Sequence, residues 1–265
     1  MVINEYLKRI GYEGSLEPTA ETLRRLHQTH MLAVPFENLD IPLGRPIVLS
    51  LPLFYEKIVR NRRGGFCYEL NGLFGWLLER IGFQVVMLSA RVFDGNQPGA
   101  EFDHLILMIG IEEGLIADVG FGDSFLEPLR LEDTEENVQH GSSYRLTGLH
   151  YEKTLQRRRE SDWESQYSFS LTPRRLCEFT AGCQQQQTSS ESIFTRKTVC
   201  SLATLDGRIT LSNDRLIITA GMQHEEQEVT GETEYRVLLK THFGIDLSNE
   251  TRVDRLMAAA TPSSR

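Results

Sequence analysis

The stretch RRGGFCYELN, residues 62–71, places two glycines and a cysteine at the start of a helical pattern. Over residues 67–81 the apolar side chains recur on one helical face, at Leu70, Phe74, Leu77, Leu78 and Ile81. Gly82 follows as a candidate C-cap. Cys67 is therefore predicted at the N-terminus of an amphipathic helix, where the helix dipole and free N–H groups stabilise a thiolate and lower the thiol pKa.

Cys67 has two interpretations at this point. It is either a nucleophile or a buried, inert thiol, and the second is the commoner fate of an isolated cysteine. Gly64 and Gly65 allow a substrate to approach the backbone closely, which favours the first interpretation. The four cysteines contain no CxxC pair and are too few for a disulfide scaffold, so reduced thiols are expected.

The composition is that of a soluble globular protein with one large domain or two to three small ones. The chain has 265 residues, 40% of them hydrophobic, and a net charge of −9. This charge argues against a general nucleic-acid-binding protein, which usually has a basic face, but leaves room for a local basic patch. The polar N-terminus and the short apolar runs indicate neither a signal peptide nor a membrane span, so a cytoplasmic protein is expected.

Periodicity divides the chain into three parts. The first third is predicted to be helical, over residues 18–30, 51–61 and 67–81. The middle is predicted to form strands, over residues 84–93, 104–111, 115–121, 143–148, 151–156 and 166–171, with a hairpin loop at 112–114. The last third is mixed, with an exposed loop over 178–191, a hairpin over 207–220 that turns at 213–214, and helices over 232–243 and 249–260.

A thiolate nucleophile needs a base and a group that orients the base. Among seven histidines, His104 differs because it opens an apolar strand, where its ring needs a polar partner. Asp118 likewise interrupts an apolar strand, and a carboxylate there must be paired. A His104–Asp118 pair meets both needs, either as part of a catalytic triad or as a purely structural pair.

The simplest hairpin keeps these two residues apart. A loop at 112–114 pairs Ile111 with Leu115, which leaves His104 and Asp118 four positions apart, about 13 Å along the strand. A catalytic pair therefore requires a bulge, strong coiling or a different register.

The chain resembles the arylamine N-acetyltransferases in short motifs spread over most of its length. They are YLKRIG at 6–11, VPFENL at 34–39, RGGFC at 63–67 with Asn71, DHL at 103–105, DVGFG at 118–122 and, more weakly, SIFT at 192–195 ahead of CSL at 200–202. Each motif alone is weak. The ordered set is specific, because Cys67, His104 and Asp118 follow one another at separations of 37 and 14 residues.

The resemblance implies an α+β fold with a Cys67–His104–Asp118 triad and a core like that of the cysteine proteases. It implies three regions: an N-terminal helical bundle with the cysteine (1–83), a central β-barrel with the histidine and aspartate (84–192), and a C-terminal α/β lid (193–265).

The resemblance also implies the reaction. Acetyl-CoA is the expected co-substrate, and the acetyl group passes by ping-pong kinetics through an acetyl-cysteine to the nitrogen of an arylamine or arylhydrazine. A role in xenobiotic metabolism follows from the same resemblance. The expected partners are these small molecules, with no metal, nucleic acid or membrane.

Three phenylalanines match positions that line the acceptor pocket or the cofactor mouth in the family. Phe36 and Phe121 match the pocket, and Phe194 lies nearer the mouth. Without the resemblance, core packing is the better interpretation of each. Arg63 and Glu37 are expected to pair and to brace the loop that carries the nucleophile.

The residues after Asp118 are candidate cofactor contacts. Gly120, Gly122 and Ser124 could offer backbone or hydroxyl donors to phosphate groups. Asp123 departs from the family, which often has a small or a polar neutral residue there, and a carboxylate at this position would repel a pyrophosphate.

Three alternatives remain. A transglutaminase-like or papain-like amide hydrolase would use the same triad with another acyl acceptor. An amide synthase would take its acyl chain from a carrier instead of acetyl-CoA. A non-catalytic binding protein could share the scaffold, although the presence of all three triad residue types argues against it.

Overall fold

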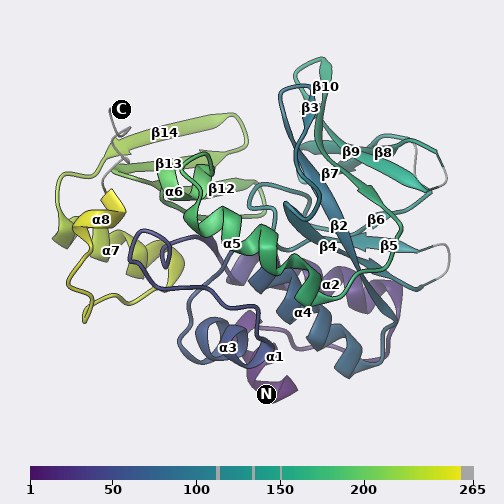
Figure 1. The fold of residues 1–265 in the computed structure, drawn as a ribbon, viewed down its shortest axis with the longest axis horizontal. Helices are drawn as coiled ribbons and strands as arrows, with labels where there is room; N and C mark the ends of the chain where they lie inside the picture. The colour runs from purple at the N-terminus through teal and green to yellow at the C-terminus, as the bar shows by residue number, and fades with distance from the viewer. Residues whose placement is uncertain (112–113, 133–134, 150, 258–265) are drawn as a thin grey trace.

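The computed structural model describes residues 1–111, 114–132, 135–149 and 151–257. Helices from the first part of the chain lie along one side of the molecule, and two antiparallel sheets rise from them (Figure 1). One sheet has nine strands and the other has five. No helix within the described residues has the length and apolar character to span a membrane.

The N-terminal helices are α1 (Ile3–Ile10), α2 (Ala20–Ala33), α3 (Leu51–Tyr55), the π-helical turn η1 (Glu56–Arg60) and α4 (Cys67–Ile81). The predicted helix over 67–81 is confirmed, and Gly82 ends it in the left-handed conformation. Every residue from Cys67 to Leu78 is buried, so α4 is the central core helix. The side chain of Thr19 caps α2, whereas that of Ser50 makes no cap hydrogen bond to α3.

The nine-stranded sheet curls into a nearly closed barrel. Its strands are β2 (Val85–Asp94), β3 (Gln97–Pro98), β4 (His104–Ile109), β5 (Leu115–Ala117), β6 (Leu129–Arg130), β7 (Asn137–Gln139), β8 (Ser142–Thr147), β9 (Glu152–Arg159) and β10 (Asp162–Ser170). The order is β6-β5-β4-β2-β10-β9-β8-β7, and β3 pairs with β2.

The predicted strand over 115–121 is too long, because β5 ends at Ala117 and Asp118 leaves the ladder. The β4–β5 register also differs from the simplest hairpin. Ile109, and not Ile111, pairs with Leu115. Residues 112–113 of the predicted hairpin loop lie outside the described residues.

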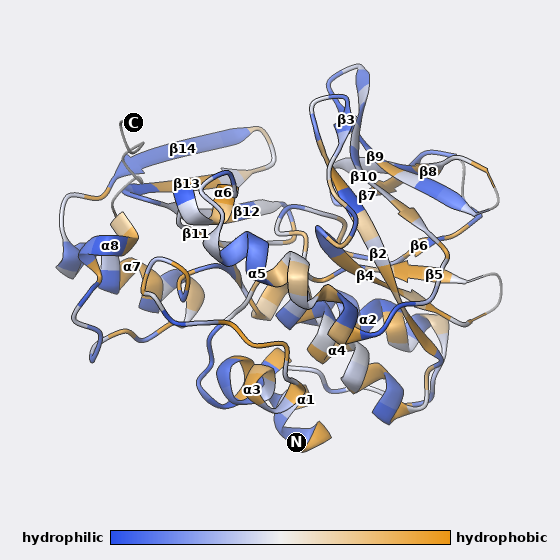
Figure 2. Cartoon of the chain, in the orientation of Figure 1, coloured by the Kyte–Doolittle hydropathy of each residue, from blue (hydrophilic) through white to orange (hydrophobic). Residues whose placement is uncertain are grey.

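The five-stranded sheet contains a strand from the N-terminal part of the chain. Its strands are β1 (Phe36–Glu37), β11 (Val199–Ala203), β12 (Gly207–Ser212), β13 (Arg215–Ala220) and β14 (Gln223–Glu228), hydrogen-bonded in that order. The predicted hairpin at 213–214 is confirmed, and Asn213 adopts a positive φ of 49° in the turn. The edge strand β14 is exposed and hydrophilic along its whole length (Figure 2).

Helices α7 (Glu232–Phe243) and α8 (Asp254–Met257) complete the C-terminal region. The prediction for α7 is confirmed. Of the predicted helix over 249–260, α8 covers the middle, and residues 258–260 lie outside the described residues.

The loop predicted over 178–191 is wrong. Its first part is the end of the 3₁₀ turn η2 (Leu176–Phe179), followed by helix α5 (Thr180–Thr188), and α6 (Ile193–Arg196) comes shortly after. The segment has little apolar periodicity, and tertiary contacts hold it instead. Cys183 is buried, and the Gln187 amide exchanges hydrogen bonds with the Ile47 backbone at 2.7 and 2.9 Å.

Candidate active site

The first turn of α4 is anchored by a buried carboxylate. Glu69 accepts a hydrogen bond from the Phe66 backbone N–H at 3.2 Å and from Lys57 Nζ at 3.0 Å. Burial raises the pKa of Glu69 to about 7, and Lys57 opposes this shift. The loop before the helix packs so closely that a Cβ on Gly64 would lie 2.0 Å from the Pro35 carbonyl oxygen, so only glycine fits there.

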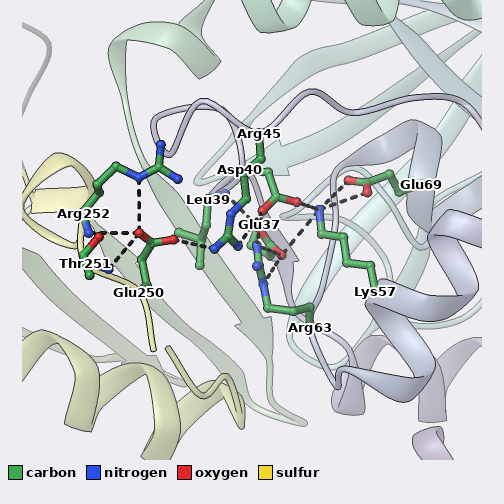
Figure 3. A network of polar contacts seen from close by, with 10 residues as sticks. All are labelled: Glu37, Leu39, Asp40, Arg45, Lys57, Arg63, Glu69, Glu250, Thr251 and Arg252. Atoms are coloured by element: carbon green, nitrogen blue, oxygen red, sulfur yellow. Dashed lines mark hydrogen bonds and ion pairs between the residues drawn. The ribbon is translucent and has the colours of Figure 1, made fainter. Parts of the chain in front are cut away.

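A network of ion pairs extends from this turn toward the C-terminal region (Figure 3). The Arg63 guanidinium binds Glu37 at 2.8 Å and Asp40 at 3.1 Å, and Lys57 binds Asp40 at 2.8 Å. The expected Arg63–Glu37 pair is thus confirmed. Because Glu37 is fully buried and Lys57 lies farther from it, at 3.7 Å, removal of Arg63 would leave the Glu37 charge poorly compensated, at a cost of about 3 kcal/mol.

His104 and Asp118 form a buried pair. His104 Nε2 lies 2.8 Å from Asp118 Oδ2. The other carboxylate oxygen, Oδ1, accepts from Asn71 Nδ2 at 2.8 Å and from the Gly120 N–H at 2.9 Å. Burial raises the pKa of Asp118, but His104, Asn71 and Gly120 outweigh it, so the pKa lies below its ordinary value and the carboxylate is ionised.

The register of β4 and β5 explains how this pair forms. Leu107 pairs with Ala117, so Asp118 follows opposite Ile106 and lies two positions from His104. Two positions correspond to about 7 Å along a strand, half the separation of the simplest hairpin, and side chains can bridge it. A different register, with Asp118 already out of the ladder, therefore brings the two side chains together.

Cys67 lies against the backbone on both sides of His104. Its Sγ is 4.0 Å from the Asp103 carbonyl oxygen. Burial raises the pKa of the Cys67 thiol well above its ordinary value, and the backbone amides of Leu105 and Tyr68 oppose this shift. The lowered pKa expected from the helix dipole is therefore wrong, because loss of solvation outweighs the helix terminus.

The segment after β5 packs directly on the start of α4. A Cβ on Gly120 would lie 2.8 Å from Cys67 Cα and 2.7 Å from Asn71 Nδ2. Asn71 of α4 joins β4 to the segment after β5. Its amide also donates to the Leu105 carbonyl at 2.6 Å and accepts from the Val119 N–H at 2.9 Å. The cysteine, histidine and aspartate predicted from the sequence thus come together in one buried region.

The three predicted phenylalanines lie around this region. The Phe121 ring centroid is 5.2 Å from that of His104. Phe36 packs against Gly122 and lies 6.0 Å from Phe194 between ring centroids. The Phe194 ring is also 6.0 Å from that of Phe66, the residue before Cys67. Their predicted role in substrate binding stays a prediction.

The predicted cofactor contacts differ in their surroundings. The Gly120 N–H is already used by Asp118, and Gly122 has a positive φ of 91° against Phe36. The Ser124 hydroxyl is buried and has no hydrogen-bond partner among the described residues. Asp123 is surrounded by arginines, with Arg157 at 2.8 Å, Arg208 at 3.3 Å and Arg159 at 3.4 Å.

His27 contacts the site, although it lies in none of the sequence motifs. Its Nδ1 lies 2.8 Å from the Leu126 carbonyl oxygen, and its Nε2 accepts from the Asp118 N–H at 3.1 Å. Burial lowers the pKa of His27 to about 4, so the ring is neutral. Its place on the apolar stripe of α2, beside Leu23 and Leu26, is the one sequence signal of a buried role.

The described residues contain no group of three or more His, Cys, Asp or Glu that could hold a metal ion. The donor set of the site is one thiol, one imidazole and one carboxylate, an arrangement that serves nucleophilic acyl transfer.

Comparison with known proteins identifies related sequences. A family model described as N-acetyltransferase matches residues 19–252. The arylamine N-acetyltransferase of Mycolicibacterium smegmatis is 33% identical over 257 residues, covering 94% of each chain.

Solved structures have the same fold. The arylamine N-acetyltransferase from Salmonella typhimurium superposes with a TM-score of 0.90 at 32% identity, covering 97% of each chain. The Mycobacterium marinum enzyme in complex with CoA gives a TM-score of 0.88 at 31% identity, covering 97% of this chain and 98% of that one. The α+β fold with its nearly closed barrel is thus confirmed, and the chain belongs to the arylamine N-acetyltransferase family.

Proposed function

We propose that this protein is an arylamine N-acetyltransferase that carries acetyl groups from acetyl-CoA to the nitrogen of arylamines or arylhydrazines. Its nucleophile is Cys67, with His104 as base and Asp118 as the group that orients it. The observation that carries this proposal is the buried His104–Asp118 pair at 2.8 Å, beside a cysteine at the first position of a helix.

His104 transfers the proton through Nδ1, because its Nε2–H donates to Asp118. The raised pKa of Cys67 means that a free thiolate is costly here. The thiol therefore keeps its proton until the sulfur attacks, when His104 Nδ1 takes it, and the ionised Asp118 stabilises the imidazolium that forms.

The first half-reaction exchanges one thioester for another. The Cys67 sulfur attacks the acetyl carbonyl carbon, and the C–S bond to CoA breaks. The CoA sulfur leaves with the proton from His104. Acetyl-Cys67 remains, and the small difference in energy between the two thioesters makes this step readily reversible.

The second half-reaction releases the product. The amine nitrogen attacks acetyl-Cys67, His104 Nδ1 takes a proton from that nitrogen, and the proton passes to the Cys67 sulfur as the C–S bond breaks. Phe121 beside His104, and Phe194 beside Phe36 and Phe66, supply aromatic surface that suits a flat acceptor. Gly120, Gly122 and Ser124 are assigned to the CoA side of the site.

The same proposal extends to the setting of the reaction. All four cysteines are free, which supports a cytoplasmic location, and xenobiotic amines are the class of acceptor that the family implies. We assign residues 1–83 to the helical bundle, 84–192 to the barrel and 193–265 to the lid.

Intact-mass measurement after incubation with acetyl-CoA and no amine tests the proposal. The protein should gain one acetyl group and lose it when an arylamine is added. Cys67→Ala should gain none, whereas Cys183→Ala, which removes another buried thiol, should still be acetylated. Asp118→Asn should slow acetylation by about a thousandfold or more while the protein stays folded.

A folded wild-type protein that is not acetylated would refute the proposal. Hydrolysis of acetyl-Cys67 without transfer to any amine would favour the hydrolase alternative. Acylation from a carrier-bound chain and not from acetyl-CoA would favour the amide synthase alternative.

A further inference from the structure

Asp123 holds together arginines from two different sheets. Arg157 and Arg159 lie on β9 of the nine-stranded sheet, and Arg208 lies on β12 of the five-stranded sheet. Arg157 and Arg208 are mostly buried, with side chains 12% and 14% exposed, whereas the Asp123 side chain is 49% exposed. The carboxylate can therefore turn toward solvent, while the two guanidinium groups cannot.

Neutral groups hold these two arginines from the other side. Arg157 donates to the Ser142 hydroxyl at 3.0 Å and lies 5.6 Å from the centroid of the Tyr144 ring. Arg208 donates to the Ser201 hydroxyl at 3.1 Å. Among the residues that the structure describes, Asp123 is the one carboxylate within ion-pair distance of Arg157 and Arg208. Two cations thus face one anion.

The cluster lines a cavity with a volume of about 1050 Å³. This volume is enough for a nucleotide-sized ligand. The buried Ser124 hydroxyl, which lacks a partner among the described residues, lines the same cavity. An unused donor and two fixed guanidinium groups are the groups that a phosphate requires.

We propose that Arg157 and Arg208 form a subsite for a phosphate group of the acyl donor, and that Asp123 occupies it as an internal counter-ion until the phosphate displaces it. This inference rests on the proposed function, because it assumes that the donor is a CoA thioester.

The subsite lies within reach of the nucleophile. Asp123 is three residues from Gly120, which packs on Cys67, so their Cα atoms are at most about 11 Å apart. The pantetheine arm of CoA, which separates the thioester from the phosphates, can extend between the two places. A phosphate group has more negative charge and more acceptor oxygens than a carboxylate. It therefore binds a pair of guanidinium groups more strongly than the Asp123 carboxylate does.

The test compares two acetyl donors, acetyl-CoA and S-acetylpantetheine, which lacks the phosphates. The rate of Cys67 acetylation is measured against donor concentration by intact mass. Asp123→Asn should lower the half-saturating concentration of acetyl-CoA by roughly three- to tenfold and leave that of S-acetylpantetheine unchanged. Arg208→Gln should raise the half-saturating concentration of acetyl-CoA about tenfold and leave that of S-acetylpantetheine unchanged.

Asp162→Asn is the matched control. Asp162 lines the same cavity but lies outside ion-pair distance of Arg157 and Arg208, so the variant removes the same charge without freeing the arginines. Asp162→Asn should change the half-saturating concentration of acetyl-CoA much less than Asp123→Asn does. A second measurement needs no activity: inorganic pyrophosphate should raise the Tm of Asp123→Asn more than that of the wild type.

Several outcomes separate the possibilities. If Asp123→Asn raises the half-saturating concentration of acetyl-CoA, or changes both donors equally, Asp123 is a brace between the sheets and the inference is overturned. An unchanged pyrophosphate response in that variant also overturns it. If neither donor acetylates wild-type Cys67, the proposed function fails instead.

Discussion

His27 is the residue that links stability most directly to the chemistry of the site. Its Nδ1–H donates to the Leu126 carbonyl, so Nε2 carries the lone pair that accepts the Asp118 N–H. Protonation of the ring would remove that lone pair and would place a charge in a buried site between the rings of Phe74 and Phe125. The fold therefore needs this imidazole to be neutral.

We predict that His27 makes the protein sensitive to acid. Burial holds the folded-state pKa of His27 near 4, below the ordinary value of 6.5. As the pH falls from 6.5 to 4, the unfolded chain binds a proton that the folded chain does not. His27 thus contributes about 3 kcal/mol to the free energy of unfolding. This contribution is complete above pH 6.5 and is lost as the pH falls toward 4.

Urea unfolding at pH 7.5 and pH 4.5 checks this prediction. His27→Gln should lower the free energy of unfolding at pH 7.5 and should show a smaller loss between the two pH values than the wild type. Burial also lowers the pKa of His30, so part of the pH dependence of stability remains in both proteins. An equal loss in wild type and variant would contradict the prediction.

At the scale of elements, local signals predicted some segments and failed for others. Helix α4 was predictable because its apolar stripe and Gly82 both lie within one short stretch. The β4–β5 register was not, because a hairpin loop longer by two residues is equally compatible with the apolar pattern. Helix α5 was missed because its own sequence has little apolar periodicity. Contacts to Ile47, far away in the chain, support it instead.

The element that joins the two halves of the site is the segment after β5, and its fit against α4 gives a second prediction. Gly120→Ala should slow Cys67 acetylation about a hundredfold, since its Cβ would collide with the Cys67 and Asn71 positions and displace them by a fraction of an ångström or more. The free energy of unfolding should fall by about 1–3 kcal/mol.

Gly231→Ala is the matched control for this prediction. Gly231 has an extended backbone with φ of −171°, and a Cβ there meets nothing within 4 Å. The acetylation rate should stay near the wild-type value, and the free energy of unfolding should fall by no more than about 1 kcal/mol, because alanine is a poorer N-cap for α7 than glycine. If Gly120→Ala acetylates Cys67 as fast as Gly231→Ala, the close packing of this segment on the nucleophile does not matter for the chemistry.

At the scale of the whole molecule, the site depends on segments that are remote in sequence. The motifs and their order predicted the triad, because each residue type is tied to its chemistry. No local pattern could predict that β1 would pair with β11, about 160 residues later, or that Arg157 and Arg208 would meet at Asp123. Such pairings depend on the complete fold, in which sheets from separate regions face one another.

Asn38 makes this dependence measurable, because it joins the N-terminal region to the segment around α6 and β11. Its buried amide donates to the Phe194 carbonyl at 3.0 Å and to the Lys197 carbonyl at 2.8 Å, and accepts from the Val199 N–H at 2.8 Å. Asn38→Ala leaves all three backbone groups without this partner, so the free energy of unfolding should fall by about 2–4 kcal/mol.

Urea unfolding of Asn38→Ala, beside the exposed control Asn4→Ala, measures this loss. Because the amide also fixes the backbone of Phe194, the KM for an arylamine should rise several-fold while Cys67 acetylation by acetyl-CoA keeps its rate. A variant as stable as Asn4→Ala would show that β1 pairing alone joins the two regions. A loss of stability with an unchanged arylamine KM would show that Phe194 keeps its position without Asn38 or does not contact the acceptor.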